Sequence, residues 1–185
     1  MVFETSQLNR SCTLPYSSIL YWKDPFFCIS RMNLLPSWDM RYKKIPYEEF
    51  VSIYRKVPRA AVDVIVTTPQ GILLTKRAVP PYQGKWHIPG GTILFREPIQ
   101  HAIQRIAKEE LGIRVHVVRH LGIIEYLNNE GGHVVSNAYL ATIASGTLRD
   151  SEQSKGIEFF KRIPTQCIPY QKKFLKDHWD TLTQA

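Results

Sequence analysis

A glycine pair stands shortly ahead of a segment that ends in two adjacent glutamates, and this arrangement constrains the chain more than any other feature. The segment is residues 86–113, WHIPGGTILFREPIQHAIQRIAKEELGI. Pro98 suits the first turn of a helix, where its missing N–H is not needed, and Gly112 suits the left-handed residue that ends one. The spacing therefore predicts a helix over residues 98–111, with Glu97 directly before it.

One side of this predicted helix is apolar, yet a carboxylate falls on it. At about 100° per residue, the apolar stripe consists of Ile99, Ala102, Ile103 and Ile106. Glu110 projects onto the same stripe, where a charge is costly unless it is paired or bound to a cation. Glu109 lies beside it, and Arg105 lies one turn back.

Two interpretations of this helix end follow. It is either a solvated end in which Arg105 pairs with a glutamate, or a divalent-cation site built together with the glycine pair. The nearby Gly90–Gly91 and Glu97 favour the cation site. Mg²⁺ is the natural ion because it takes oxygen ligands and is usually held by one or two carboxylates together with substrate phosphates.

The whole segment resembles the signature of the Nudix hydrolases, G-x5-E-x7-R-E-U-x-E-E-x-G-U, in which U is a bulky aliphatic residue. The matching positions are Gly91, Glu97, Arg105, Glu109, Glu110, Gly112 and Ile113. Two positions depart from it, because Ile106 replaces the acid after the arginine and Ala107 replaces the first U. Matches to this many fixed positions at the correct spacing make the resemblance specific.

The resemblance implies a Mg²⁺ site, with Mn²⁺ as a substitute, held by the backbone carbonyl of Gly91 and by Glu109 and Glu110. It implies a catalytic contribution from Arg105 and a supporting role for Glu97. The acid that Ile106 replaces is a metal ligand or general base in many family members. Its absence argues against a multi-metal site of the usual kind but leaves a single-metal site intact.

One branch of the family, the GDP-mannose mannosyl hydrolases, also carries an aliphatic residue after this arginine. These enzymes cleave the sugar C–O bond rather than the diphosphate P–O bond. The chain resembles them over residues 45–58, 61–66, 73–77 and 81–91. By position, Asp63 matches an acid that contacts substrate, and Arg77 matches an arginine that steadies the leaving diphosphate. The resemblance further implies a homodimer.

Other positions depart from that branch. Thr92 stands where those enzymes carry a second arginine. If Gly122 is aligned with their corresponding glycine, Glu125 falls on a metal ligand that is Gln there, and Tyr126 falls on their catalytic histidine. The general base is then Glu125, or His133 in the neighbouring loop, where a histidine is otherwise merely solvated.

The loop before the glycine pair carries two aromatic side chains. Tyr82 is a candidate for substrate binding, and Trp86 either stacks on a nucleobase or simply packs beside the loop.

Composition bounds the class of protein. A chain of 185 residues fits one domain, and we place it at residues 41–185, after an irregular segment at 1–40. Cys12, Cys28 and Cys167 form no paired framework, which indicates free thiols in a reducing cytoplasm. No apolar run reaches the roughly 20 residues of a membrane span.

The net charge of +8 is concentrated in one region. Residues 41–90 hold nine bases and three acids, which gives +6 there. Such a field attracts a diphosphate substrate. Nucleic acid is the rival partner for a basic chain, but no recognisable nucleic-acid motif accompanies the charge.

The order of expected elements predicts an α/β fold, the Nudix α/β/α sandwich with a mixed sheet. We expect helices at residues 46–54, 98–111 and 170–182, and strands at 59–67, 72–77, 115–126, 134–143 and 156–160.

The predicted function is Mg²⁺-dependent hydrolysis of a small nucleoside diphosphate derivative, foremost a nucleotide sugar such as GDP-mannose. One alternative is P–O cleavage of an ADP-ribose or dinucleotide type of substrate. The other is a Nudix-like binding or regulatory domain that lost turnover together with the acid at Ile106.

Overall fold

The computed structural model describes residues 44–128 and 132–184, all within the compact unit Arg41–Ala185. The helices are α1 (Tyr47–Tyr54), α2 (Ile99–Ile106), the π-helical turn η2 (Ala107–Leu111), α3 (Pro169–Asp177) and α4 (Trp179–Thr183). The strands are β1 (Arg59–Thr68), β2 (Gly71–Arg77), β3 (Trp86–His87), β4 (Gly90–Thr92), β5 (Ile113–Asn128), β6 (Gly132–Gly146) and β7 (Ser154–Phe160).

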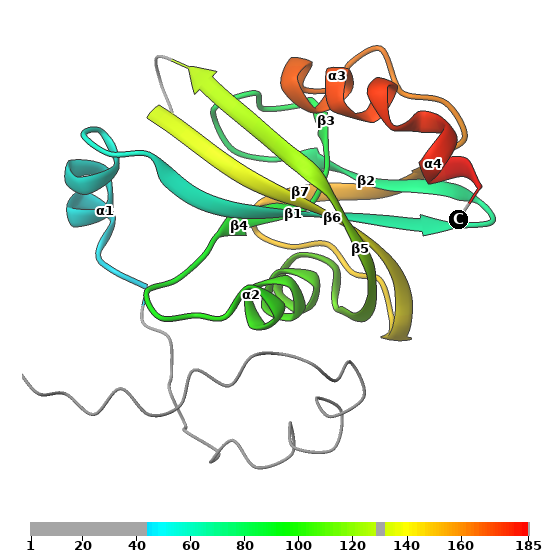
Figure 1. Cartoon of the computed structure of the whole chain (residues 1–185), viewed down its shortest axis with the longest axis horizontal. Coiled ribbons are helices and arrows are strands. Elements are labelled where there is room, and N and C mark those ends of the chain that lie inside the picture. Colours follow the sequence, from blue (N-terminus) through cyan, green and yellow to red (C-terminus); the bar gives the residue numbers. More distant parts are fainter. Residues whose placement is uncertain (1–43, 129–131, 185) are drawn as a thin grey trace, which may run out of the picture. The chain divides into compact units, whose positions relative to one another are not determined.

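The seven strands form one mixed sheet with helices on both faces (Figure 1). The main path runs β3-β2-β1-β6-β5, while β4 pairs with β1 and β7 pairs with β2. Only the β1–β6 pairing is parallel among those described; the others are antiparallel. In Figure 1, α2 lies on one side of the sheet and α3 and α4 lie on the other. The predicted α/β/α sandwich is confirmed.

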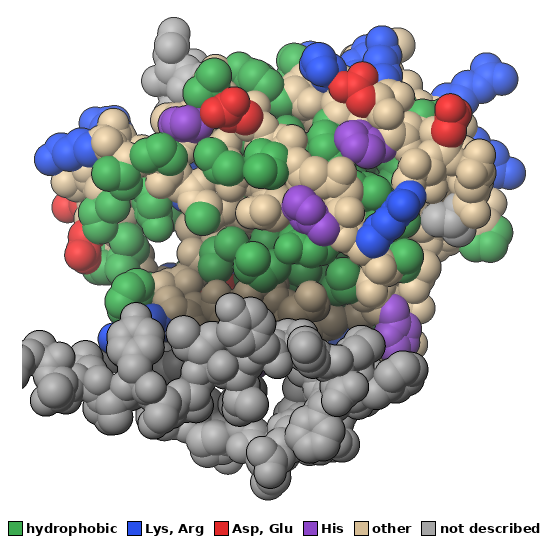
Figure 2. Space-filling view, in the orientation of Figure 1, with side chains coloured by type: hydrophobic (Ala, Val, Ile, Leu, Met, Phe, Trp, Pro, Cys, Tyr) green, Lys and Arg blue, Asp and Glu red, His purple; other side chains and the backbone are tan. Residues whose placement is uncertain are grey.

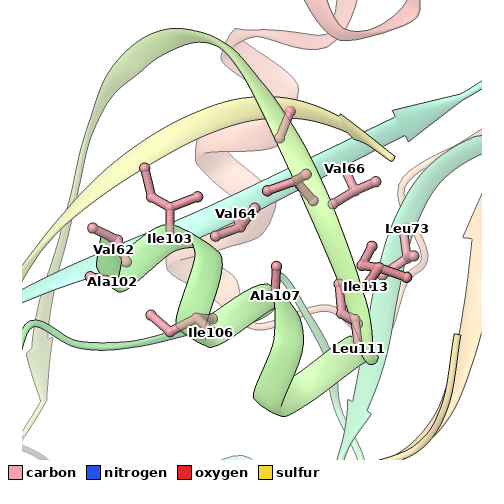
Figure 3. Close-up of a cluster of buried hydrophobic side chains, with 12 residues drawn as sticks. Val62, Val64, Val66, Leu73, Ala102, Ile103, Ile106, Ala107, Leu111 and Ile113 are labelled. Carbon is pink, nitrogen blue, oxygen red and sulfur yellow. The ribbon is translucent and has the colours of Figure 1, made fainter. Parts of the chain in front are cut away.

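Strand β1 is buried along most of its length, as expected for a central strand covered on both faces. Its alternate residues Val62, Val64 and Val66 face α2 and form one core with the helix (Figure 3). The helix contributes Ala102, Ile103 and Ile106 to this core, all of them buried.

A second core lies on the opposite face, beneath α3 and α4. It contains Ile65, Leu74, Ile88, Ile124, Leu140, Phe174, Leu175 and Leu182. Because successive residues of a strand point to opposite faces, Asp63 also lies on this side of β1. The sheet therefore presents a buried acid toward the C-terminal helices.

The site helix departs from the continuous α-helix predicted over residues 98–111. Pro98 is the cap residue with extended backbone, and the last turn widens into the π-helix η2. The prediction for Ile99 was wrong, since its side chain is 38% exposed at the start of the helix. Gly112 ends the helix with a φ of 76°, which confirms the predicted left-handed stop.

The C-terminal helix also differs, because it breaks at His178 into α3 and α4. The two short strands β3 and β4 occur where the sequence indicated only a loop segment around the glycine pair. Trp86 packs edge-on against Phe160, with the ring centroids 4.9 Å apart.

Some predictions fall outside the described residues. The boundary at residue 40 involves residues 1–40, which also carry Cys12 and Cys28, so the predicted irregular segment stays a prediction. Cys167 is a buried free thiol.

Among the described helices, none combines the length and the apolar character needed to cross a membrane.

Candidate functional site

The π-helical turn buries Glu110 against β4. Glu110 is 7% exposed, and its Oε2 has no hydrogen-bond partner among the described residues. Burial raises the pKa of this carboxyl to about 8, while a hydrogen bond from the Gly90 backbone N–H acts in the opposite direction. The position of Glu110 on the buried side is therefore as predicted, and one carboxylate oxygen remains available to a ligand.

The adjacent Glu109 points toward solvent and toward two cations. Lys44 Nζ lies 3.2 Å from Glu109 Oε2, and Arg105 Nη1 lies 3.4 Å from the same oxygen. Exposed pairs of this kind contribute little to stability. A divalent cation at this carboxylate would compete with two weak, solvent-screened partners.

Arg105 and Glu97 form the best-defined ion pair of the site. Arg105 Nε lies 2.7 Å from Glu97 Oε1, and its Nη2 lies 2.8 Å from Oε2. The same Nη2 donates to the carbonyl of Thr92 at 2.9 Å. The hydrogen bond with Glu97 raises the pKa of Arg105 further. Through these hydrogen bonds Arg105 links the loop after β4 to α2. This arrangement fits the supporting role predicted for Glu97, and it makes Arg105 a residue that positions Glu97.

The glycine pair lies against β1 in a space that admits no side chain at its first member. Gly90 pairs with Asp63 across the strands, and Gly91 pairs with Val62. A Cβ on Gly90 would lie 2.1 Å from Asp63 Oδ1 and 2.8 Å from the Val62 carbonyl oxygen. Gly90 therefore has to be glycine in this arrangement, because both neighbours are close and one is backbone.

Asp63 is enclosed rather than open to solvent. It is 5% exposed, and the Tyr126 hydroxyl donates a hydrogen bond to Asp63 Oδ2 at 2.8 Å. Burial raises the pKa of Asp63 to about 6 despite this hydrogen bond. Burial also raises the pKa of Tyr126 well above its usual value. Tyr126 is thus a neutral hydrogen-bond donor, unlike the histidine base with which sequence alignment paired it.

Arg77 is the last residue of strand β2. Its Nε donates to the Pro81 carbonyl at 2.6 Å, which fixes the guanidinium against the loop that carries Tyr82. Burial lowers the pKa of Arg77, and the charge of Glu110 partly offsets this. Tyr82 adopts a φ of 65°, uncommon for a residue with a side chain. The charges of Arg77 and Glu110 lie close enough to interact.

Glu125 and His133 lie together across strands β5 and β6. His133 Nε2 is 2.8 Å from Glu125 Oε1, and the pair joins the two strands. Side chains alternate along a strand, so Glu125 points away from the face on which Tyr126 meets Asp63. It points toward the face that α2 covers, because it pairs through Val135 with Ala60, two residues before Val62. Residues 129–131 of the intervening loop are outside the described part of the chain.

The loop over residues 147–153, between β6 and β7, approaches Arg77. At one end the Arg149 N–H donates to the Leu111 carbonyl at 3.0 Å, and at the other the Ala78 N–H donates to the Gln153 carbonyl at 2.9 Å. Strand β7 then begins with Ser154 paired to Arg77. The loop carries two exposed acids, Asp150 and Glu152, and Asp150 Oδ1 accepts the Gly156 backbone N–H at 3.1 Å. Sequence reasoning singled out neither, although both lie in the polar stretch directly before the last strand.

The donor set suits a small, hard cation. Glu110 supplies an unpartnered buried oxygen, Glu109 a second carboxylate, and the glycine strand backbone carbonyls. Within residues 44–128 and 132–184, no three His, Cys, Asp or Glu side chains cluster closely enough to hold a metal ion together. A site here would consequently rest on two carboxylates plus backbone and substrate oxygens, a pattern typical of Mg²⁺.

Residues 57–177 match the model of the NUDIX domain. A protein of Methanocaldococcus jannaschii described as an ADP-ribose pyrophosphatase is 32% identical over 159 residues, which cover 82% of this chain and 94% of that protein. The low-salt glycan biosynthesis protein Agl8 of Haloferax volcanii is 29% identical over 144 residues, covering 74% of this chain and 92% of that protein.

Solved structures give the same result. The crystal structure of a MutT NUDIX hydrolase from Burkholderia pseudomallei superposes with a TM-score of 0.61 at 29% sequence identity. The match covers 65% of this chain and 97% of that one.

Proposed function

The chain belongs to the NUDIX family of hydrolases, whose domain model it matches over residues 57–177, and on that premise we propose that it hydrolyses a nucleoside diphosphate linked to a sugar. The foremost candidate substrate is GDP-mannose, cleaved at the C–O bond between sugar and diphosphate. The single observation that carries the proposal is the buried Glu110 oxygen without a partner among the described residues, beside the glycine strand and within reach of the charge of Arg77.

In this proposal Glu109, Glu110 and the Gly91 carbonyl hold Mg²⁺, for which Mn²⁺ can substitute. The ion supplies Lewis-acid stabilisation of the charge that grows on the departing diphosphate. Arg77 adds a fixed positive charge on the same side, because its hydrogen bond to the Pro81 carbonyl restricts the guanidinium. Arg105 fixes Glu97 and the loop after the glycine pair.

Two observations bear on the bond that is cleaved. Ile106 occupies the position of the acid used in many diphosphate-cleaving members and is buried in the core under α2, which favours C–O cleavage with a single cation. The Haloferax relative is described as a glycan biosynthesis protein, which supports a sugar-linked substrate. The Methanocaldococcus relative supports the second candidate, P–O cleavage of an ADP-ribose type of substrate.

The base that activates water has two candidate locations. The sequence pointed to Glu125 or His133, which lie together across β5 and β6. The loop over residues 147–153 offers Glu152, at the end of the loop that leads to Arg77. The second location is favoured because that loop is anchored both to the end of η2 and to the strand that carries Arg77.

A basic surface alone does not make nucleic acid the better partner. In the view of Figure 2, Lys and Arg side chains of the described residues are scattered among apolar and polar ones rather than gathered in a stripe. A small diphosphate needs only the local charge around Arg77 and the cation.

The experiment is turnover of GDP-mannose and of ADP-ribose with Mg²⁺ in ¹⁸O-labelled water, with mass spectrometry of the products. Label in released mannose supports C–O cleavage, and label in a phosphate-containing product establishes P–O cleavage instead. Turnover of neither substrate, with cation binding retained, would favour a binding or regulatory domain. Light scattering of the same preparation tests the predicted homodimer.

A further inference from the structure

Gln171 of α3 is a buried polar residue that sequence reasoning did not single out. It is 3% exposed, and both ends of its amide are used. Its Oε1 accepts the Ile88 backbone N–H at 2.8 Å, and its Nε2 donates to the Tyr126 hydroxyl at 2.9 Å. One side chain therefore joins the C-terminal helix to the segment before the glycine pair and to strand β5.

The path continues from Tyr126 to the glycine strand. The Tyr126 hydroxyl donates to Asp63 Oδ2 at 2.8 Å, so it accepts one hydrogen bond and gives another. The other oxygen of Asp63 lies so close to Gly90 that a Cβ there would be 2.1 Å away. The Gly90 backbone in turn lies beside the Glu110 carboxyl, whose pKa it lowers against the effect of burial.

We propose that Gln171 and Tyr126 are positioning residues, which set the place of Asp63 and the Gly90–Gly91 strand relative to Glu110 through these hydrogen bonds and the close contact of Asp63 with Gly90. The C-terminal helix thereby determines the geometry of the cation site without touching the cation. The consequence for cation binding rests on the proposed function, whereas the consequence for the glycine strand does not.

Packing alone does not account for these polar groups. The Tyr126 ring already packs against Tyr170, with centroids 5.6 Å apart, and against the second core. A phenylalanine would fill the same space without requiring a buried glutamine. Buried polar networks of this kind are costly when only partly satisfied, and residues that orient metal ligands typically change metal affinity by about 10–100-fold when replaced.

The test uses Tyr126→Phe and Gln171→Met in the full chain, which remove hydrogen-bonding groups and retain much of the side-chain volume. Tyr170→Phe is the matched control, because its hydroxyl also bridges α3 and β5 but donates to the Leu127 carbonyl, away from Asp63. The first readout is the hydrogen-exchange rate of the Gly90 amide, measured by NMR in the metal-free protein. Both test variants should accelerate that exchange several-fold, and the control should not.

The second readout is Mn²⁺ binding measured by calorimetry. Both test variants should weaken the apparent affinity on the order of tenfold, while Tyr170→Phe stays within twofold of wild type. Equal effects of Tyr126→Phe and Tyr170→Phe in both readouts, or no effect of either, would overturn the proposal. If wild type binds no Mn²⁺, the proposed function fails, and Gly90 exchange still decides whether this path positions the glycine strand.

Discussion

Gly91 and Ile106 approach each other so closely that a Cβ on the glycine would lie 3.3 Å from Ile106 Cδ1. The residue that replaces the signature acid therefore lies directly beside the backbone proposed to carry the cation. Ile106 is also part of the core between α2 and β1. The substitution thus removes a charge at the site and adds apolar packing beneath it.

Restoring the acid tests what this replacement does. In Ile106→Glu, the new carboxylate would be buried beside Gly91 and would need a cation as partner. We expect a melting temperature well below that of wild type in EDTA, largely recovered with Mn²⁺, as followed by calorimetry. Ile106→Gln is the control, since it has similar volume without the charge. Identical responses of the two variants to Mn²⁺ would contradict the placement of the cation.

Gly90 should tolerate a side chain far less well than Gly91. Gly90→Ala places a methyl group against the Val62 carbonyl oxygen and Asp63, whereas Gly91→Ala meets only the flexible end of Ile106. We expect Gly90→Ala to lower the free energy of unfolding by about 1–3 kcal/mol and Gly91→Ala to lower it by less. Urea denaturation measures both. A larger loss for Gly91→Ala would contradict the close approach at Gly90.

The two locations proposed for the base can be separated by a pair of matched variants. If Glu152 activates water, Glu152→Gln should lower kcat by about 10²–10⁴-fold with unchanged Mn²⁺ affinity, and Glu125→Gln should retain most activity. Steady-state kinetics on whichever substrate turns over provides the measurement. The opposite ranking would return the role to the Glu125–His133 pair.

Buried His87 should make stability depend on pH. Its Nδ1 donates to the Ile88 carbonyl at 2.9 Å, and its Nε2 lies 3.0 Å from Thr75 Oγ1, from which the neutral ring accepts. Burial lowers the pKa of His87 from 6.5 to about 4. The unfolded chain therefore binds a proton before the folded one does, and stability falls as pH drops from 6.5 toward 4, by about 3 kcal/mol in total.

His87→Gln should remove that part of the pH slope, and replacing the exposed His116 by Gln should leave it intact. Urea denaturation at several pH values between 4 and 7 measures the slopes. Equal slopes for wild type and His87→Gln would show that the histidine is not held neutral.

The sequence predicted the architecture because its patterns are local. Apolar β-branched runs marked the central strands, and Gly112 marked the end of the site helix. The burial of Glu110 followed from simple helical periodicity, although the π turn that accompanies it did not, since no propensity marks such a turn.

Relationships between distant segments could not be predicted in the same way. The hydrogen bond from Tyr126 to Asp63 joins residues 63 positions apart, and the bond from Gln171 to Ile88 spans 83. Only the order of strands in the sheet and the packing of α3 against it bring such residues together. For the same reason the sequence could not indicate that residues 147–153 approach Arg77. Strand alternation alone, in contrast, already places Glu125 and Tyr126 on opposite faces.

Cation binding and turnover in Glu110→Gln test the central claim most directly. Glutamine keeps the shape and removes the charge, while Glu158→Gln, at an exposed position on β7, controls for loss of a glutamate elsewhere. Calorimetric titration with Mn²⁺ and ¹⁸O-labelled turnover of GDP-mannose and ADP-ribose are measured on wild type and both variants. The account predicts a folded Glu110→Gln protein with at least tenfold weaker Mn²⁺ binding and no detectable turnover, beside an unchanged Glu158→Gln. Wild-type Mn²⁺ affinity and turnover in Glu110→Gln would contradict it.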